Sequence, residues 1–257
     1  MTPQWQTYFL LIFLATLFEY YRHRLVAAIN QKETWKSDQY HWISENLKKA
    51  WRLVLILIVW FIIAVFTTKA AVLLAFVPLG ILTILYSVPG LENRNYLFKL
   101  RQIPYVKIFL IYFVLSSSTI LLPVIQAGEK IFETQVILLF AERFFFIFAI
   151  AIPFDIRDMH TDKNAGLKTI PLLIDQNKAL LLSYLSLSVS LLISFFHYRM
   201  QNNWFIIEAL CISLIITYLF LKLNYFRNIN RYYYQILDGT LLLQGLLVLG
   251  FYYFKLG

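Results

Sequence analysis

The stretch from Thr134 to Pro171 reads TQVILLFAERFFFIFAIAIPFDIRDMHTDKNAGLKTIP. Its first part, Thr134–Phe154, is mostly apolar and is long enough to cross a bilayer, which takes about 20 residues of helix. Its second part is polar and holds several aspartates before Gly166 and Pro171. The stretch therefore predicts a membrane-spanning helix that ends in a carboxylate-rich segment.

The composition of the whole chain is that of a membrane protein. Hydrophobic residues make up 60% and charged residues only 14% of the 257 positions, and the mean hydropathy is +0.66. A soluble domain is about one quarter charged, because water must solvate its surface. The single cysteine, Cys211, excludes a disulfide framework. The scattered histidines also do not form the histidine boxes of a membrane desaturase.

Apolar segments of about bilayer length recur along the chain. We expect spans at Trp5–Tyr21, Trp51–Thr67, Ala70–Val88, Tyr105–Ile125, Thr134–Phe154, Ala179–Tyr198, Trp204–Leu223 and Ile236–Leu256. The second and third are separated by little more than Thr68 and Lys69, which predicts a tight helical hairpin. The predicted fold class is all-α: a polytopic membrane bundle of about eight helices, forming one transmembrane domain over residues 1–257.

Basic residues alternate between the two sides of this predicted bundle. Of the 23 lysines and arginines, 18 lie in the first, third, fifth and seventh connections or in the span ends next to them, 4 lie in the even connections and the C-terminal part, and Arg143 lies within a span. Cytoplasmic loops carry the excess of basic residues. We therefore expect cytoplasmic loops near 22–50, 89–104, 155–178 and 224–235, with both termini outside. The net charge of +9 is then mainly a topology signal and does not indicate nucleic-acid binding.

Three carboxylates follow the fifth span: Asp155, Asp158 and Asp162. If the helix continues into them, Asp158 lies about 60° and Asp162 about 20° from Asp155 around the axis. Like charges on one face repel one another, and Mg²⁺, which prefers carboxylate and phosphate oxygens, removes that repulsion. Taken alone, the aspartates are equally compatible with a solvated loop.

Two motifs together resemble a known family. The run Asp155, Asp158, Asp162, Gly166, Lys168, Thr169, Pro171 resembles the second aspartate-rich motif of the UbiA superfamily of intramembrane prenyltransferases. Upstream, Tyr86-Ser87-Val88-Pro89, followed by Arg101 and Lys107, resembles the family's Tyr-Ser/Thr-x-Pro segment with its basic residues. Family members have nine helices and two cytoplasmic aspartate motifs that hold Mg²⁺. They condense a prenyl diphosphate with an acceptor. The resemblance covers nearly the whole chain.

The chain departs from the family at the first motif, an Asn-Asp-x-x-Asp type of sequence. The corresponding segment here, Leu17–Leu25, contains no aspartate. Both the loss of this motif and the count of eight helices instead of nine follow if the family's first helix is missing. Glu19 and His23 could help to hold a metal, and Arg24 could bind diphosphate directly. Alternatively, the Arg-His-Arg run anchors the helix end to lipid headgroups.

The resemblance implies a set of site residues and partners. Asp155, Asp158 and Asp162 are expected to bind Mg²⁺ and to be catalytic, and the diphosphate is expected to contact Arg24, Arg101, Lys107 and Lys168. The expected partners are a prenyl diphosphate, a lipophilic acceptor and membrane lipid. Aromatic side chains could stabilise an allylic cation; the candidates are Tyr86, Tyr112, Phe144, Phe145 and Phe146. The alternative function is a non-catalytic binder or transporter of prenyl or lipid diphosphates on the same scaffold.

Arg143 is a separate feature, because it lies inside a predicted span. Charged residues in the membrane are costly and have partners. Its neighbour Glu142 points away from it on a helix, so the sequence does not identify the partner of Arg143. We expect Arg143 to serve a structural ion pair or to line the central cavity.

Overall fold

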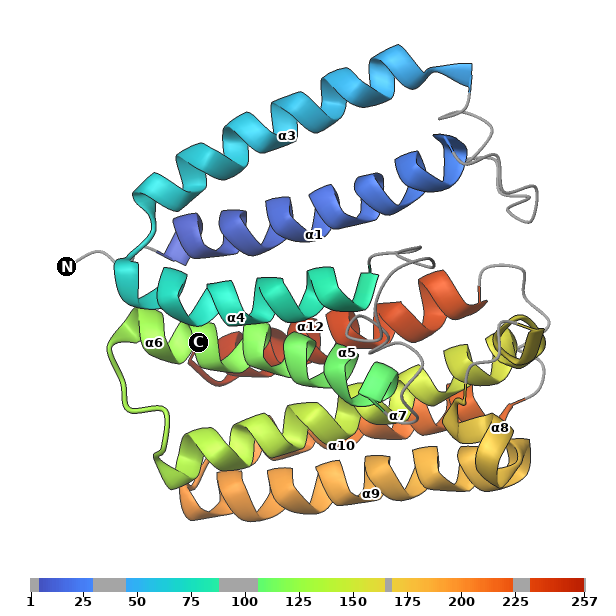
Figure 1. Ribbon diagram of the computed structural model, residues 1–257. Helices are drawn as coiled ribbons and strands as arrows, with labels where there is room; N and C mark the ends of the chain where they lie inside the picture. The colour runs from blue at the N-terminus through green and yellow to red at the C-terminus, as the bar shows by residue number, and fades with distance from the viewer. Residues whose placement is uncertain (1–4, 30–44, 88–105, 165–167, 224–231, 257) are drawn as a thin grey trace. The chain divides into compact units, whose positions relative to one another are not determined.

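The computed structural model describes residues 5–29, 45–87, 106–164, 168–223 and 232–256, which are helical apart from short connections. Figure 1 shows the order of the elements. They are α1 (Trp5–Ile29), α3 (Leu47–Thr67), α4 (Ala70–Ser87), α5 (Val106–Ser116), η3 (Ser117–Leu121), α6 (Leu122–Ala127), α7 (Thr134–Asn164), α8 (Ile170–Ile174), α9 (Gln176–Met200), α10 (Trp204–Lys222), η4 (Tyr232–Leu237) and α12 (Asp238–Leu256). The segments η3 and η4 are π-helical.

Most of the predicted spans are found as apolar helices. Six described helices are long and apolar enough to cross a membrane: Leu47–Thr67, Phe109–Ala127, Thr134–His160, Gln176–Met200, Trp204–Lys222 and Gln235–Phe254. Two shorter apolar helices, Tyr8–Glu19 and Ala70–Ile84, coincide with the other two predicted spans. The all-α membrane fold is confirmed, while the count of eight spans stays a prediction.

Several helices extend into segments predicted as loops. In the region near 22–50, α1 continues to Ile29 and α3 begins at Leu47. In the region near 155–178, α7 continues to Asn164 and the short α8 follows. The predicted loop near 89–104 lies outside the described residues, as does most of the one near 224–235.

The chain divides into two compact units. Unit 1 comprises Met1–Ile81 and Leu122–Lys130, and unit 2 comprises Leu82–Leu121 and Ile131–Gly257. In unit 1, α1 packs beside α3 (Figure 1), with Leu11, Leu14 and Ala64 buried in its core. The predicted hairpin is confirmed, because α3 ends at Thr67 and α4 begins at Ala70.

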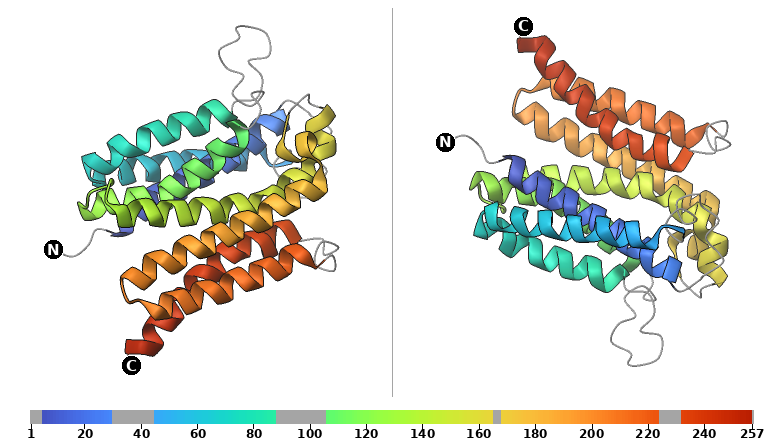
Figure 2. Two further views of the ribbon diagram at one scale, coloured as in Figure 1. Left: turned by 90° about the horizontal axis from the view of Figure 1, so that it is seen from below. Right: turned by 90° about the horizontal axis from the view of Figure 1, so that it is seen from above.

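Unit 2 is built around the pair α7 and α9, which make the most extensive helix–helix contact in the described chain. Small residues on α9 are buried against the bundle; they are Ala179, Ser183, Ser186, Ser190 and Ser194. Small side chains let two helix backbones approach closely, which is how helices associate in lipid without a hydrophobic driving force. Figure 2 shows α9, α10 and α12 side by side, and α10 contacts both of the others.

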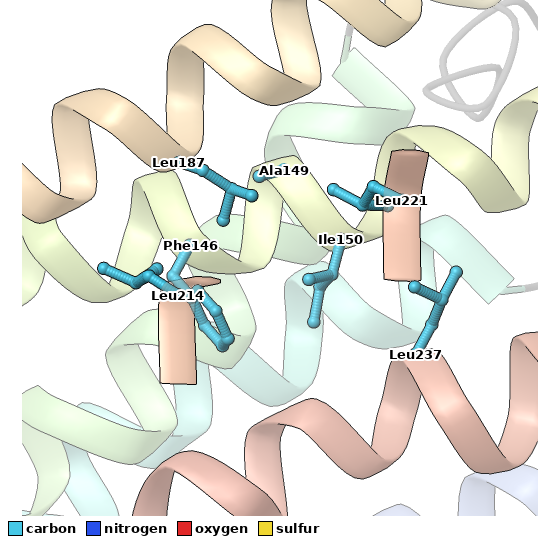
Figure 3. Packing of buried hydrophobic residues seen from close by; sticks show 7 residues of the cluster. All are labelled: Phe146, Ala149, Ile150, Leu187, Leu214, Leu221 and Leu237. Atoms are coloured by element: carbon cyan, nitrogen blue, oxygen red, sulfur yellow. The ribbon is translucent and has the colours of Figure 1, made fainter. Parts of the chain in front are cut away.

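A hydrophobic core joins four elements of unit 2 (Figure 3). Its residues are Phe146, Ala149 and Ile150 of α7, Leu187 of α9, Leu214 and Leu221 of α10, and Leu237 of η4. Other apolar side chains of α9, such as Leu181, Leu185 and Phe196, are exposed. An exposed apolar face on a membrane-spanning helix is where lipid contacts it, so the core gains its stability chiefly from close packing.

Candidate functional site

The three aspartates lie on one uninterrupted helix, since α7 runs from Thr134 to Asn164. This confirms the predicted continuation of the fifth span into the polar segment. Asp155 and Asp162 are buried, whereas the Asp158 side chain is 41% exposed. Two carboxylates are therefore enclosed at this end of unit 2, and one is open to solvent.

Pro153, two residues before Asp155, removes one backbone hydrogen bond from α7. Pro153 lies inside the helix and has no N–H, so it cannot bond to the carbonyl of Ala149 four residues earlier. The hydroxyl of Ser183 on α9 donates to that carbonyl over 2.5 Å. Serine side chains commonly satisfy backbone groups that a proline frees within a membrane helix. The Ser183 bond thus ties α9 to α7 less than two turns before Asp155.

Arg157 is a functional candidate that the sequence analysis missed. Its Nε donates to Oδ1 of Asp158 over 2.7 Å, and its Nη2 donates to Oδ2 over 2.9 Å. The guanidinium also lies over the rings of Phe154 and Tyr233, with centroids 5.3 and 4.9 Å away. The sequence could have indicated the contact with Phe154, which lies three residues earlier on α7. It could not have indicated the contact with Tyr233, which lies on η4 and is distant in sequence.

The donor set fits a magnesium ion held jointly with a substrate. Among the described residues, no three His, Cys, Asp or Glu side chains converge closely enough to form a metal cage. Mg²⁺ is usually bound through one or two carboxylates plus substrate phosphates, and it rarely occupies an all-protein cage. Oxygen donors spaced along one helix end suit that mode of binding, because the phosphates supply the remaining ligands.

The predicted diphosphate-binding residues are spread over several segments. Lys168 is exposed next to the buried Thr169, just before α8. Arg24 lies in α1 of unit 1, and Lys107 lies in the first turn of α5 in unit 2. Arg101 falls outside the described residues.

The remaining predicted motif residues are placed in two helices. Glu19 and His23 lie in α1, and Tyr86 and Ser87 end α4. Pro89 lies outside the described residues. Glu19 is partly buried within unit 1.

Aromatic side chains line the contact between α5 and α7. Tyr112 is buried and meets the edges of Phe144 and Phe148 at centroid distances of 6.3 and 5.1 Å. Phe109 and Phe113 extend the cluster along α5. At 1.5 Å per residue, Phe148 and Phe144 precede Asp155 by roughly 10 and 16 Å along α7. Phe146, in contrast, faces the hydrophobic core (Figure 3).

The partner of Arg143 is a glutamine on another helix. Its Nη1 donates to Oε1 of Gln244, which is buried on α12. The neighbouring Glu142 is buried, and its backbone carbonyl accepts from Ser190 of α9 over 3.0 Å. The structural role expected for Arg143 agrees with these contacts, although its partner is an amide and not a carboxylate.

Comparison with known proteins gives one family and two similar structures. The sequence model of the UbiA prenyltransferase family matches residues 41–233. The structure is similar to that of a UbiA homologue from Archaeoglobus fulgidus bound to Cd²⁺, with a TM-score of 0.65, 15% identity, and coverage of 97% of this chain and 87% of that chain. It is also similar to a digeranylgeranylglyceryl phosphate synthase, with a TM-score of 0.59, 16% identity and coverage of 95% and 83%. No curated protein sequence matches the chain.

Proposed function

The chain belongs to the UbiA prenyltransferase family, and from this membership we propose that it transfers a prenyl group from a prenyl diphosphate to a lipophilic acceptor in the membrane, with Mg²⁺ as cofactor. The observation that carries the proposal is the aspartate segment Asp155–Asp162 at the end of a continuous spanning helix. In the proposed reaction, the bond between the allylic carbon and the diphosphate oxygen breaks, and the diphosphate leaves with the electron pair. The allylic carbon then bonds to the acceptor, which loses a proton.

Asp155, Asp158 and Asp162 are the proposed metal ligands and catalytic residues. When bound, Mg²⁺ neutralises the diphosphate and makes it a better leaving group. Asp158 is accessible from solvent, so it can receive a metal that arrives together with the diphosphate. The buried Asp155 and Asp162 hold their carboxylates in fixed positions on the same helix.

Basic side chains are proposed to bind the diphosphate oxygens. Lys168 is exposed a few residues beyond the end of α7, and Arg24, Arg101 and Lys107 complete the proposed set. Arginine recognises phosphate through two parallel hydrogen bonds, whereas lysine acts as a point charge. The supporting feature is that Arg101 and Lys107 follow the Tyr86–Pro89 motif and Lys168 lies within the aspartate motif, while Arg24 lies in the segment that corresponds to the family's first motif.

The aromatic cluster of α5 and α7 is proposed to accept the hydrocarbon chain. A prenyl group whose diphosphate lies at Asp155 can extend along α7 past Phe148 and Phe144. An aromatic face stabilises a cation by about 0.5–2 kcal/mol, and the larger values apply where water is excluded. Tyr112 is buried in this helix contact.

We propose that the site faces the cytoplasm and that both termini lie outside, because cytoplasmic loops carry the excess of basic residues. The 18 basic residues in the odd connections support this orientation. A reporter fused after Gly257 should be accessible only from outside the cell. Cytoplasmic accessibility of that reporter would overturn the proposed orientation.

The direct test uses the purified full chain in lipid nanodiscs with Mg²⁺, labelled prenyl diphosphates of several lengths and a mixture of acceptors. We expect diphosphate release that Asp158→Asn abolishes. Asp175→Asn is the matched control, because Asp175 is exposed and caps α9 through the N–H of Asn177, a position that asparagine occupies equally well.

The same assay separates the enzyme from a binder or transporter. Mg²⁺-dependent binding of the prenyl diphosphate without turnover, over a broad set of acceptors, would contradict the proposed transferase and support the non-catalytic alternative. The absence of an aspartate from Leu17–Leu25 motivates this comparison.

A further inference from the structure

We infer that Arg157 is an exchangeable counter-ion: it holds Asp158 while no metal is bound, and it turns to the diphosphate when the metal takes that carboxylate. This inference rests on the proposed function and adds a residue that couples metal binding to diphosphate binding. It also gives a role to the best-defined ion pair in the described part of the chain.

The Arg157 guanidinium contacts both carboxylate oxygens of Asp158. Nε and Nη2 of Arg157 each meet one oxygen of Asp158, at 2.7 and 2.9 Å. A metal that binds Asp158 must share or displace these hydrogen bonds. It also brings a double positive charge next to the guanidinium, and like charges at such short range repel. Arg157 therefore weakens the binding of a metal ion to Asp158 when no diphosphate is present.

The guanidinium of Arg157 also lies over two aromatic rings. The rings of Phe154 and Tyr233 hold it from two elements, α7 and η4. Arginine stacks on aromatic faces while its planar fork stays free to form hydrogen bonds. Released from Asp158, the guanidinium therefore remains at the site, and Nε and Nη2 no longer donate to that carboxylate. Phosphate oxygens are the acceptors that this fork matches best.

A second carboxylate interacts with Arg157 and would balance its charge after the exchange. Asp238, at the start of α12, also interacts electrostatically with Arg157. The guanidinium thus keeps a carboxylate nearby when Asp158 binds metal. A diphosphate adds negative charge that attracts both Arg157 and the metal, so metal and diphosphate are expected to bind cooperatively.

A second arginine provides a matched control. Arg199 lies over the rings of Phe195 and Trp204, with centroids 5.6 and 6.0 Å away, at the opposite end of α9 from Asp175. Among the described residues, Arg199 forms no ion pair. It therefore reproduces the aromatic mounting without the carboxylate. Arg199→Gln removes the same charge and the same stacking from a place outside the proposed site.

The experiment measures binding, not turnover. The full chain in nanodiscs is titrated with Mn²⁺, followed by electron paramagnetic resonance, and then with labelled inorganic pyrophosphate at a fixed Mn²⁺ concentration. Arg157→Gln should bind Mn²⁺ alone about two- to fivefold more tightly, which is the range of a partly exposed ion pair. It should bind pyrophosphate at least about tenfold more weakly, because a charge-assisted hydrogen bond is lost. Arg199→Gln should match the unmodified chain in both titrations.

Two further variants keep the test informative if Arg157→Gln does not fold. Arg157→Lys keeps the charge but loses the fork, and it should also bind pyrophosphate more weakly. Tyr233→Leu removes one ring and leaves all charges, and it should weaken pyrophosphate binding about two- to fivefold with unchanged Mn²⁺ affinity. If Arg157→Lys behaves like the unmodified chain in both titrations, the positive charge alone accounts for the effect of Arg157, and the proposed exchange is wrong.

The outcomes separate this inference from the proposed function. If Mn²⁺ binds and Asp158→Asn abolishes the binding, but Arg157→Gln changes neither titration, the exchange alone is wrong. Weaker Mn²⁺ binding by Arg157→Gln also overturns it, because Arg157 then only positions Asp158. If the unmodified chain binds no Mn²⁺ with or without pyrophosphate, or Asp158→Asn binds it equally well, the proposed metal site fails and the exchange fails with it.

Discussion

Helix α7 carries two polar regions that the fold treats differently. Glu142 and Arg143 lie within the spanning part, and their hydrogen bonds reach α9 and α12 through Ser190 and Gln244. The second region, Asp155–Asp162, lies at the polar end of the same helix and includes the solvent-accessible Asp158. The first region is closed by neighbouring helices, while the second is open on one side.

This difference distinguishes polar residues that stabilise the helix bundle from polar residues that are proposed to take part in the reaction. A charged group inside the bilayer is tolerated when other helices supply hydrogen bonds, and such bonds then tie the bundle together. Carboxylates at a helix end gain nothing from one another and need a cation or an arginine. Substitutions in the first region should therefore change stability, and substitutions in the second should change activity.

The largest expected effect comes from neutralising one buried carboxylate in each region. Asp155→Asn should lower prenyl transfer at least about 100-fold, equivalent to ~2.7 kcal/mol of barrier, because a proposed metal ligand is lost. Glu142→Gln, which neutralises a carboxylate on the same helix, should keep activity within about twofold. Prenyl transfer and thermal unfolding of both variants are measured in parallel. Equal losses of activity would erase the proposed division between the two regions.

A smaller effect is expected where the two helices are joined near the proline. Ser183→Ala leaves the Ala149 carbonyl buried without the donor that Pro153 cannot supply, and this should lower the free energy of unfolding by about 1–3 kcal/mol. Ser190→Ala is the comparison. The Glu142 carbonyl that accepts from Ser190 lies in a regular part of α7, where no proline removes the helical hydrogen bond. We expect the free energy of unfolding of that variant to fall by only about 0.6 kcal/mol.

The two serine variants are compared by unfolding in mixed micelles, with Ser188→Ala as a second reference. Ser188 is exposed and bonds only to Tyr184 of its own helix. Equal destabilisation by Ser183→Ala and Ser190→Ala would show that the proline-freed carbonyl has no special need of a donor.

Features that depend on local sequence could be predicted, and features that depend on helix pairing could not. The continuation of α7 beyond Phe154 and the break at Thr68–Lys69 follow from apolar length and helical periodicity. The same local reasoning identified the run of aspartates. It also indicated that Arg143 needed a partner, because any charge in lipid needs one.

The partners themselves are contributed by helices that are distant in sequence. Gln244 is 101 residues from Arg143, and Ser183 is 34 residues from Ala149. No periodicity within one helix reveals which face of another helix it will meet. Arg157 was missed for the same reason, since one of its two rings comes from η4. Lys69 likewise donates to the distant carbonyl of Gln126 over 2.7 Å.

The smallest expected effect tests the closed region directly. Gln244→Leu removes the acceptor of Arg143 while keeping a side chain of similar size on α12. The loss should be about 1 kcal/mol of stability, because the unfolded chain in a membrane also finds polar partners for arginine. Gln235→Leu, at an exposed position on η4, controls for the change in polarity. Pyrophosphate affinity should be unchanged in Gln244→Leu, since Arg143 belongs to the structural region; weakened pyrophosphate binding at native stability would place Arg143 in the diphosphate site.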